Sequence, residues 1–127
     1  LGRVNLEKKE MEFINMGHEP MMVLDQNFNF EYIKSTLPPS GLMFVKDESF
    51  FKTTTMNISN KTILIYTDGV TEGYIDEDKE LEVEGLEKEI KQLNTTSPET
   101  IINHVTKILT EKGYTLRDDI TALGIKL

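Results

Sequence analysis

The run of residues 62–67 constrains the fold more than any other part of this sequence. Residues 63–66 are Ile, Leu, Ile and Tyr, and the run ends at the turn-forming pair Asp68-Gly69. An apolar run this short cannot span a membrane and is typical of a strand whose sheet is covered on both faces. The sequence therefore predicts a layered domain built around this strand.

The sequence before this run predicts further strands, and the sequence after it predicts helices. Residues 11–14, 21–24, 28–33 and 49–56 have strand character, and turn-forming residues separate them at 25–27, 38–41 and 57–61. Apolar residues then recur at helical spacing in two segments, and the chain closes with a strand at 120–127, with Leu123, Ile125 and Leu127 on one face. The first helical segment carries Val83, Leu86, Ile90 and Leu93, and the second carries Ile101, Ile102, Val105, Ile108 and Leu109.

The second of these helices has clear end signals. Ser97 is the expected N-cap, Pro98 the first helical residue and Gly113 the stop. The order of strands, two helices and a final strand predicts an α+β fold, with helices on the outside of an antiparallel sheet. No glycine-rich nucleotide-binding motif is present in the sequence.

Charge and composition exclude several classes of function. The 127 residues are enough for one domain, and 22 acidic against 14 basic side chains give a net charge of −8. Such a surface repels nucleic acid and anionic membranes, so neither is an expected partner. The absence of cysteine excludes thiol chemistry. Without an export signal or an apolar span, the expected compartment is the cytoplasm.

Two acidic segments at strand ends are the candidates for chemistry. Asp68 follows the apolar strand, and Asp118-Asp119 precedes the last strand. If those ends are neighbours in the sheet, their carboxylates can share a hard cation such as Mg²⁺ or Mn²⁺, which prefers oxygen ligands. The alternatives are a plain turn at Asp68-Gly69 and a solvated loop, or an ion pair with Arg117, at Asp118-Asp119.

Other polar residues have structural interpretations beside functional ones. His18 is either a base or phosphate contact, or a turn histidine bonded to backbone. His104 is interpreted as a partly buried surface residue, and residues 76–80 as a solvated acidic loop.

Four motifs occur together in a recognisable order. They are Asn15-Met16-Gly17-His18-Glu19-Pro20, Leu37-Pro38-Pro39-Ser40-Gly41-Leu42, Leu64-Ile65-Tyr66-Thr67-Asp68-Gly69-Val70-Thr71-Glu72 and Asp118-Asp119-Ile120-Thr121. In this order the chain resembles the C-terminal part of the bacterial sporulation stage II protein E (SpoIIE)-type serine/threonine phosphatases, which are protein phosphatase 2C-like. The resemblance covers nearly the whole chain.

The resemblance implies a fold, a cofactor and a substrate class. The fold would be part of an α-β-β-α sandwich of two packed antiparallel sheets with helices outside. The site would hold two Mn²⁺ or Mg²⁺ ions, with Asp68 and Asp118 as catalytic metal ligands and Asp119 as an auxiliary metal carboxylate. The substrate would be a phosphoserine or phosphothreonine on a regulatory protein of the anti-sigma-factor-antagonist type.

One departure from the family pattern limits these expectations. The family's upstream acidic residue, Asp-Gly pair and Gly-His-Gly-type turn have no counterpart in residues 1–13. Residues 1–127 are therefore expected to be the C-terminal portion of the phosphatase domain, without the N-terminal half that carries the other metal motifs, and inactive alone. The alternatives are an inactive remnant that serves as a protein-binding or regulatory module, and a structural piece that self-associates through open sheet edges. Metal affinity tests the first alternative and light scattering the second.

Overall fold

The computed structural model describes residues 1–39, 41–42, 47–111 and 118–127. Three features expected from sequence involve residues outside this set: the turn at Ser40, the helix stop at Gly113 and the charge partner Arg117. The elements in chain order are β1 (Gly2–Asn5), β2 (Glu10–Phe13), β3 (Met21–Leu24), β4 (Phe30–Ile33), η1 (Glu48–Phe50), β5 (Thr54–Asn57), β6 (Thr62–Tyr66), α1 (Asp68–Thr71), β7 (Tyr74–Asp76), β8 (Lys79–Glu80), α2 (Glu82–Leu93), α3 (Pro98–Thr110) and β9 (Ala122–Lys126).

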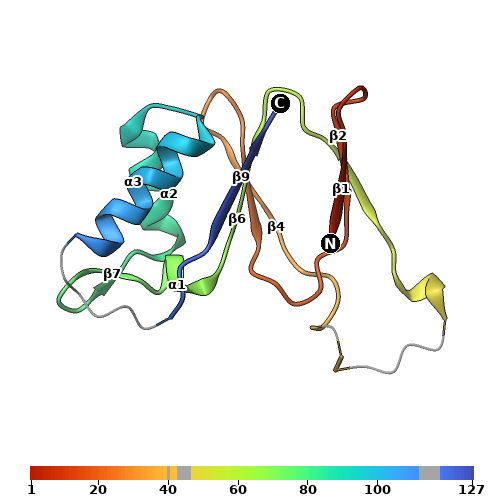
Figure 1. Cartoon of the computed structure of the whole chain (residues 1–127), viewed down its shortest axis with the longest axis horizontal. Helices are drawn as coiled ribbons and strands as arrows, with labels where there is room; N and C mark the ends of the chain where they lie inside the picture. Colours follow the sequence, from red (N-terminus) through yellow and green to blue (C-terminus); the bar gives the residue numbers. More distant parts are fainter. Residues whose placement is uncertain (40, 43–46, 112–117) are drawn as a thin grey trace.

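The elements form three layers. One sheet has the strand order β4-β3-β6-β9 and another has the order β1-β2-β5, and all the pairings within them are antiparallel. Helices α2 and α3 cover one face of the four-stranded sheet, and the three-stranded sheet lies beyond its other face (Figure 1). This arrangement confirms the predicted α+β class with antiparallel sheets and outer helices.

Strand β6 lies at the centre of the layers, as its sequence predicts. Leu64 and Tyr66 belong to the apolar cluster beneath the helices, whereas Ile63 and Ile65 belong to the cluster between the two sheets. Alternate side chains of a strand point to opposite faces of the sheet, so an unbroken apolar run is needed to fill both clusters.

The two long helices occur where the spacing of apolar residues predicts them. Helix α2 buries Leu86 and Ile90. Helix α3 begins after Ser97, whose side chain accepts a hydrogen bond from the Thr100 amide at 3.4 Å. The helical layer is tied to the sheet by the Thr62 hydroxyl, which donates to the Thr96 carbonyl at 2.6 Å.

The expected strand over residues 49–56 is wrong in its first part. Only Thr54–Asn57 is a strand, and Glu48–Phe50 is a 3₁₀ helix. The Asp47 carboxylate accepts a hydrogen bond from the Ser49 amide at 2.9 Å, and the Asp47 carbonyl accepts one from the Phe50 amide at 3.2 Å. Local side-chain bonds of this kind compete with strand pairing and explain the turn.

Smaller elements also differ from expectation. Asp68-Gly69 begins the short helix α1 rather than a simple turn, and residues 76–80 contribute to a β7–β8 hairpin rather than only to a solvated loop. Strand β1 is rich in polar and small residues and gave no strand signal; its pairing with β2 holds it, along with an Arg3–Glu12 ion pair of 2.6 Å. Of the β9 residues expected on one face, Ile125 packs between the sheets, whereas Leu123 is 54% exposed.

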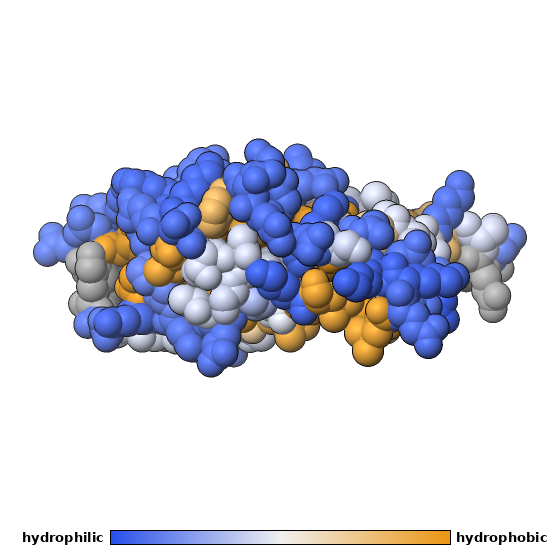
Figure 2. Space-filling model, turned by 90° about the horizontal axis from the view of Figure 1, so that it is seen from above, coloured by the Kyte–Doolittle hydropathy of each residue, from blue (hydrophilic) through white to orange (hydrophobic). Residues whose placement is uncertain are grey.

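The face shown in Figure 2 is largely hydrophilic, with hydrophobic atoms gathered at a few places. Among the described helices, none is both long and apolar enough to cross a lipid bilayer.

Candidate functional site

Thr67 joins the end of β6 to the segment before β9. Its amide donates to the Thr121 carbonyl at 3.0 Å, and its hydroxyl accepts from the Thr121 amide at 3.0 Å. The same hydroxyl donates to the Asp119 carbonyl at 2.9 Å. These three bonds extend the β6–β9 pairing by one residue and fix residues 118–121 beside the start of α1.

Gly69 brings the two segments into backbone contact. It is buried, and a Cβ atom at this position would lie 2.6 Å from the Asp119 carbonyl oxygen and 3.3 Å from that of Asp118. Any side chain here would collide with backbone that cannot rotate away. The close approach explains why glycine follows Asp68, and it places the Asp68 segment against the Asp118-Asp119 segment.

The three acidic side chains of this junction are all exposed to solvent. One oxygen of Asp68 accepts a hydrogen bond from the Gly69 amide at 2.9 Å. One oxygen of Asp118 accepts in the same way from the Asp119 amide at 2.7 Å. These bonds orient each carboxylate relative to its own backbone, and each side chain has a second oxygen with which to contact a cation.

The fit to a metal ion is partial. Exposed carboxylates on adjoining rigid segments are ligands of the kind that Mg²⁺ and Mn²⁺ use. Within residues 1–39, 41–42, 47–111 and 118–127, however, no three His, Asp or Glu side chains come together as a set that could hold a metal ion. The junction brings the Asp68 and Asp118-Asp119 segments together, but it does not make a complete metal centre of them.

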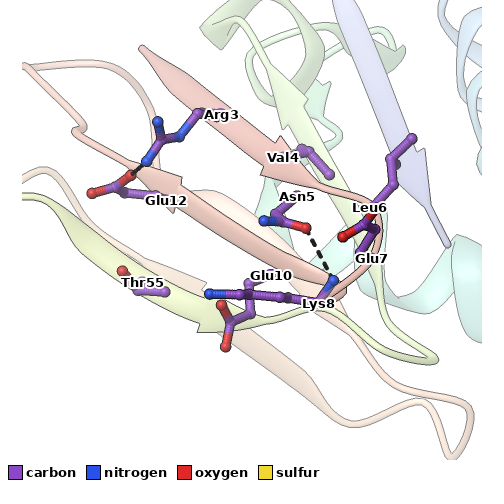
Figure 3. A pocket seen from close by; sticks show the side chains of 9 residues that line it. All are labelled: Arg3, Val4, Asn5, Leu6, Glu7, Lys8, Glu10, Glu12 and Thr55. Atoms are coloured by element: carbon purple, nitrogen blue, oxygen red, sulfur yellow. Dashed lines mark hydrogen bonds and ion pairs between the residues drawn. The ribbon is translucent and has the colours of Figure 1, made fainter.

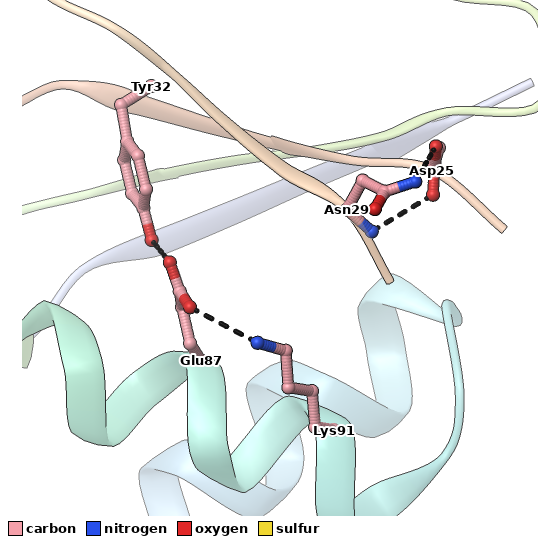
Figure 4. A network of polar contacts seen from close by, with 5 residues as sticks. All are labelled: Asp25, Asn29, Tyr32, Glu87 and Lys91. Atoms are coloured by element: carbon pink, nitrogen blue, oxygen red, sulfur yellow. Dashed lines mark hydrogen bonds and ion pairs between the residues drawn. The ribbon is translucent and has the colours of Figure 1, made fainter. Parts of the chain in front are cut away.

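Tyr66, two residues before Asp68, carries the one buried side-chain oxygen or nitrogen for which the described part of the chain offers no hydrogen-bond partner. The residue is 4% exposed. Burial, and to a smaller degree the charges of Glu19 and Glu87, raise the pKa of Tyr66 to about 12. Neighbouring Tyr32 differs, because its hydroxyl donates to Glu87 on α2, which also pairs with Lys91 (Figure 4).

Replacing Tyr66 with Phe is expected to raise the free energy of unfolding by about 1 kcal/mol, since an unpaired buried hydroxyl costs roughly 1–3 kcal/mol. Tyr32→Phe is the matched variant. It is expected to lower the free energy of unfolding by about 1 kcal/mol, because the substitution removes the hydrogen bond from Tyr32 to Glu87. Urea unfolding of both variants measures the difference. Equal changes in the two variants would show that the Tyr66 hydroxyl is satisfied in solution.

Two grooves of similar volume are among those that lie outside the junction. One, of about 570 Å³, lies beside β1 and β2 and is lined mainly by polar side chains, with Arg3 turned toward Glu12 (Figure 3). The other, of about 580 Å³, opens between the two sheets. Its walls include Phe13 from β2, Ile65 from β6, Leu123 from β9 and His18 from the segment before β3.

The two histidines have different surroundings. His104 on α3 lies 2.7 Å from the Glu89 carboxylate on α2 and is partly buried, which confirms its structural interpretation. His18 is exposed, and its Nδ1 lies 3.2 Å from the Glu19 carbonyl oxygen. Thr67 and Thr121 were missed as the residues that join the two acidic segments; the signal for them was their place beside Asp68-Gly69 and Asp119-Ile120 in the two motifs.

Comparison with known proteins identifies the family of this chain. The profile of one protein family, described as stage II sporulation protein E (SpoIIE), matches residues 1–127. The chain belongs to the SpoIIE family. Protein IcfG from Synechocystis sp. is 35% identical over 72 residues, which are 56% of this chain and 11% of that protein.

Solved structures agree with this SpoIIE membership at the level of the fold. The phosphatase domain of SpoIIE from Bacillus subtilis, in a crystal presoaked with Mn, matches 100% of this chain and 54% of its own with a TM-score of 0.71 and 16% identity. The RsbU and RsbW domains of Rv1364c from Mycobacterium tuberculosis match 97% of this chain and 34% of theirs, with a TM-score of 0.72 and 20% identity. The chain thus spans about half of the Bacillus phosphatase domain and about a tenth of IcfG.

Proposed function

We propose that this chain is the C-terminal portion of a metal-dependent serine/threonine phosphoprotein phosphatase domain that acts in the cytoplasm. The observation that carries the proposal is the junction of β6 with β9, where Thr67 and Gly69 hold the Asp68 and Asp118-Asp119 segments together. Membership of the SpoIIE family supports the reaction class.

In this proposal Asp68 and Asp118 are metal ligands and Asp119 is an auxiliary carboxylate. Bound Mn²⁺ or Mg²⁺ would activate a water molecule for attack on phosphorus and would offset the charge of the phosphoryl oxygens. The chain's own contribution is to hold the carboxylates on the ends of paired strands. A protein with a net charge of −8 needs such cations to bring a phosphorylated substrate to acidic residues.

The proposed substrate is a phosphoserine or phosphothreonine on a regulatory protein of the anti-sigma-factor-antagonist type. This proposal rests on the family resemblance of the sequence motifs. The proposed domain boundary has its own support in the groove between the sheets, where Leu123 on the edge strand β9 is 54% exposed. We propose that the first half of the domain, absent from residues 1–127, packs against the part of this groove formed by β9 and supplies the remaining metal ligands.

Calorimetric titration of the chain with Mn²⁺ tests the site directly. We expect saturable binding by the native chain and much weaker binding by Asp118→Asn, because the substitution replaces a charged oxygen ligand with a neutral amide oxygen. Asp78→Asn, at an exposed position on the β7–β8 hairpin, removes the same charge elsewhere and is expected to bind like the native chain.

The outcomes separate the phosphatase proposal from its rival. A native chain that binds no Mn²⁺ would favour a protein-binding or regulatory module, since such a module does not require these carboxylates. Equal weakening by Asp118→Asn and Asp78→Asn would show a general effect of charge and would remove the assignment of Asp118.

A further inference from the structure

The segment that carries His18 lies at the same end of the four-stranded sheet as the acidic junction. Strand β3 begins at Met21 and runs antiparallel to β6, which ends at Tyr66, so the residues before β3 and after β6 share one end of the sheet. Figure 1 shows the chain that enters β3 and the chain that leaves β6 reaching that same end.

Asn15 fixes the turn that presents His18. The residue is 8% exposed, and the hydrogen bonds of its side-chain amide are made within the turn. Its Oδ1 accepts from the His18 amide at 3.0 Å, and its Nδ2 donates to the carbonyls of His18 at 3.2 Å and Glu19 at 3.3 Å. A buried amide with three backbone partners within four residues leaves the turn little conformational freedom.

Gly17 and Ser35 brace the turn from the other side. Gly17 has a φ of +72°, and a Cβ there would lie 2.4 Å from Pro39 Cγ. Its amide donates to the Ser35 hydroxyl at 2.6 Å, and that hydroxyl lies 2.6 Å from the Leu37 carbonyl, to which it donates. Glycine adopts a positive φ without strain and leaves room for Pro39, so this residue lets the turn pack closely against the segment after β4.

The imidazole of His18 takes almost no part in this bracing. The ring is exposed, and its Nδ1 lies 3.2 Å from the Glu19 carbonyl oxygen. A carbonyl only accepts hydrogen bonds, so Nδ1 carries the proton and Nε2 is the atom left for another partner. No hydrogen bond to Nε2 is made by any residue in the described ranges, and the residue lines the groove between the sheets.

We propose that His18 is a substrate-binding residue whose Nε2, protonated in the imidazolium form, donates a hydrogen bond to a phosphoryl oxygen of a phosphate monoester. This inference rests on the proposed phosphatase function and adds a residue to it. The junction presents carboxylates, which repel a phosphate dianion, so a charged donor at the same end of the sheet would hold the substrate where the metal ions act. The rigid turn fixes the place of that donor before the substrate arrives.

Nuclear magnetic resonance of the imidazole rings tests the contact in the chain itself. The sequence has two histidines, and His104 is held between α2 and α3 by Glu89. In a titration with inorganic phosphate in the presence of Mg²⁺, we expect a saturable shift of the His18 ring signals and none for His104. Static signals for both rings, or equal shifts in both, would overturn the proposal.

Two substitutions separate the proposed contact from a structural role. His18→Asn keeps an amide group near the place of Nδ1, where it can bond to the Glu19 carbonyl, but it has no atom at Nε2. His18→Gln places its amide nitrogen near Nε2. With a phosphopeptide and the complete phosphatase domain, we expect KM to rise roughly ten- to hundredfold in His18→Asn and clearly less in His18→Gln, as for loss of a hydrogen bond to a charged group.

Calorimetry with Mn²⁺ distinguishes a failure of the His18 contact from a failure of the proposed metal site. His18→Asn is expected to bind Mn²⁺ like the native chain, so a native KM in that variant would overturn the role of His18 alone. Lys34→Gln is the control for charge, because Lys34 follows β4 at the same end of the sheet without a comparable brace. A loss in Lys34→Gln as large as that in His18→Asn would show that only the local charge matters and would reject the specific contact.

Discussion

Asp68→Asn is expected to reduce kcat by about a hundredfold or more in a form of the protein that carries the complete phosphatase domain. Substitutions that only disturb the residues supporting a metal ligand already cost roughly 10–100-fold, and the loss of a ligand itself costs more. Asp68 stands at the start of α1, where the Gly69 amide orients its carboxylate. Release of phosphate from a phosphoserine peptide in Mn²⁺ measures the effect.

The same assay needs a variant with an equal change of charge. Asp78→Asn lies on the exposed β7–β8 hairpin and is expected to keep native activity. Excess Mn²⁺ is expected to restore part of the activity of Asp68→Asn, because an amide oxygen is a weaker ligand rather than none. Native kcat in Asp68→Asn would remove Asp68 from the site and with it the main support for the proposed function.

The parts of the fold that the sequence predicts well are those in which local pattern and burial agree. Residues 63–66 are apolar at every position, and a strand between two layers places them alternately in the cluster beneath the helices and in the cluster between the sheets. Ser97 and Pro98 mark the start of α3 through the chemistry of helix ends, and the structure places both at that boundary. Such signals are contained within a few neighbouring residues.

The parts that were missed depend on partners far away in the sequence. Strand β1 has little strand propensity and is held by its register with β2, where Arg3 faces Glu12. The helix at Glu48–Phe50 arises because the Asp47 side chain bonds locally before a strand can pair. Tertiary pairing decides the first case and local side-chain competition decides the second.

The candidate site shows the same division. The motifs point to Asp68 and Asp118, but no local pattern shows that Thr67 bonds to both Asp119 and Thr121. Sequence reasoning could state only that the acidic segments would meet if their strands were neighbours. The β6–β9 register from Thr62–Lys126 to Tyr66–Ala122 supplies that condition. The role of the bracing turn before β3 also depends on contacts between separate segments, chiefly with Ser35 and Pro39.

Gly69→Ala is expected to lower the free energy of unfolding by about 1–3 kcal/mol and to weaken Mn²⁺ binding at the same time. The added methyl group would lie 2.6 Å from the Asp119 carbonyl oxygen and 3.1 Å from its carbonyl carbon. Backbone atoms cannot rotate away as a side chain can, so the segment from Asp118 to Thr121 must move, which is the cost of overpacking. Because Asp118 moves with it, its carboxylate loses its position relative to Asp68.

Gly85→Ala is the matched control, since the same methyl group meets a different neighbour. A Cβ on Gly85 would lie 3.2 Å from Leu81 Cδ1, the far end of a side chain rather than backbone, and Gly85 lies inside helix α2. Alanine is favoured over glycine there by about 1 kcal/mol, so this variant is expected to gain stability and to bind Mn²⁺ normally. Urea unfolding and calorimetry on the pair separate the steric role of Gly69 from the general preference of helices for alanine. If Gly69→Ala lost stability but bound Mn²⁺ like the native chain, the contact with Asp119 would serve folding alone, and the position of Asp118 would not depend on it.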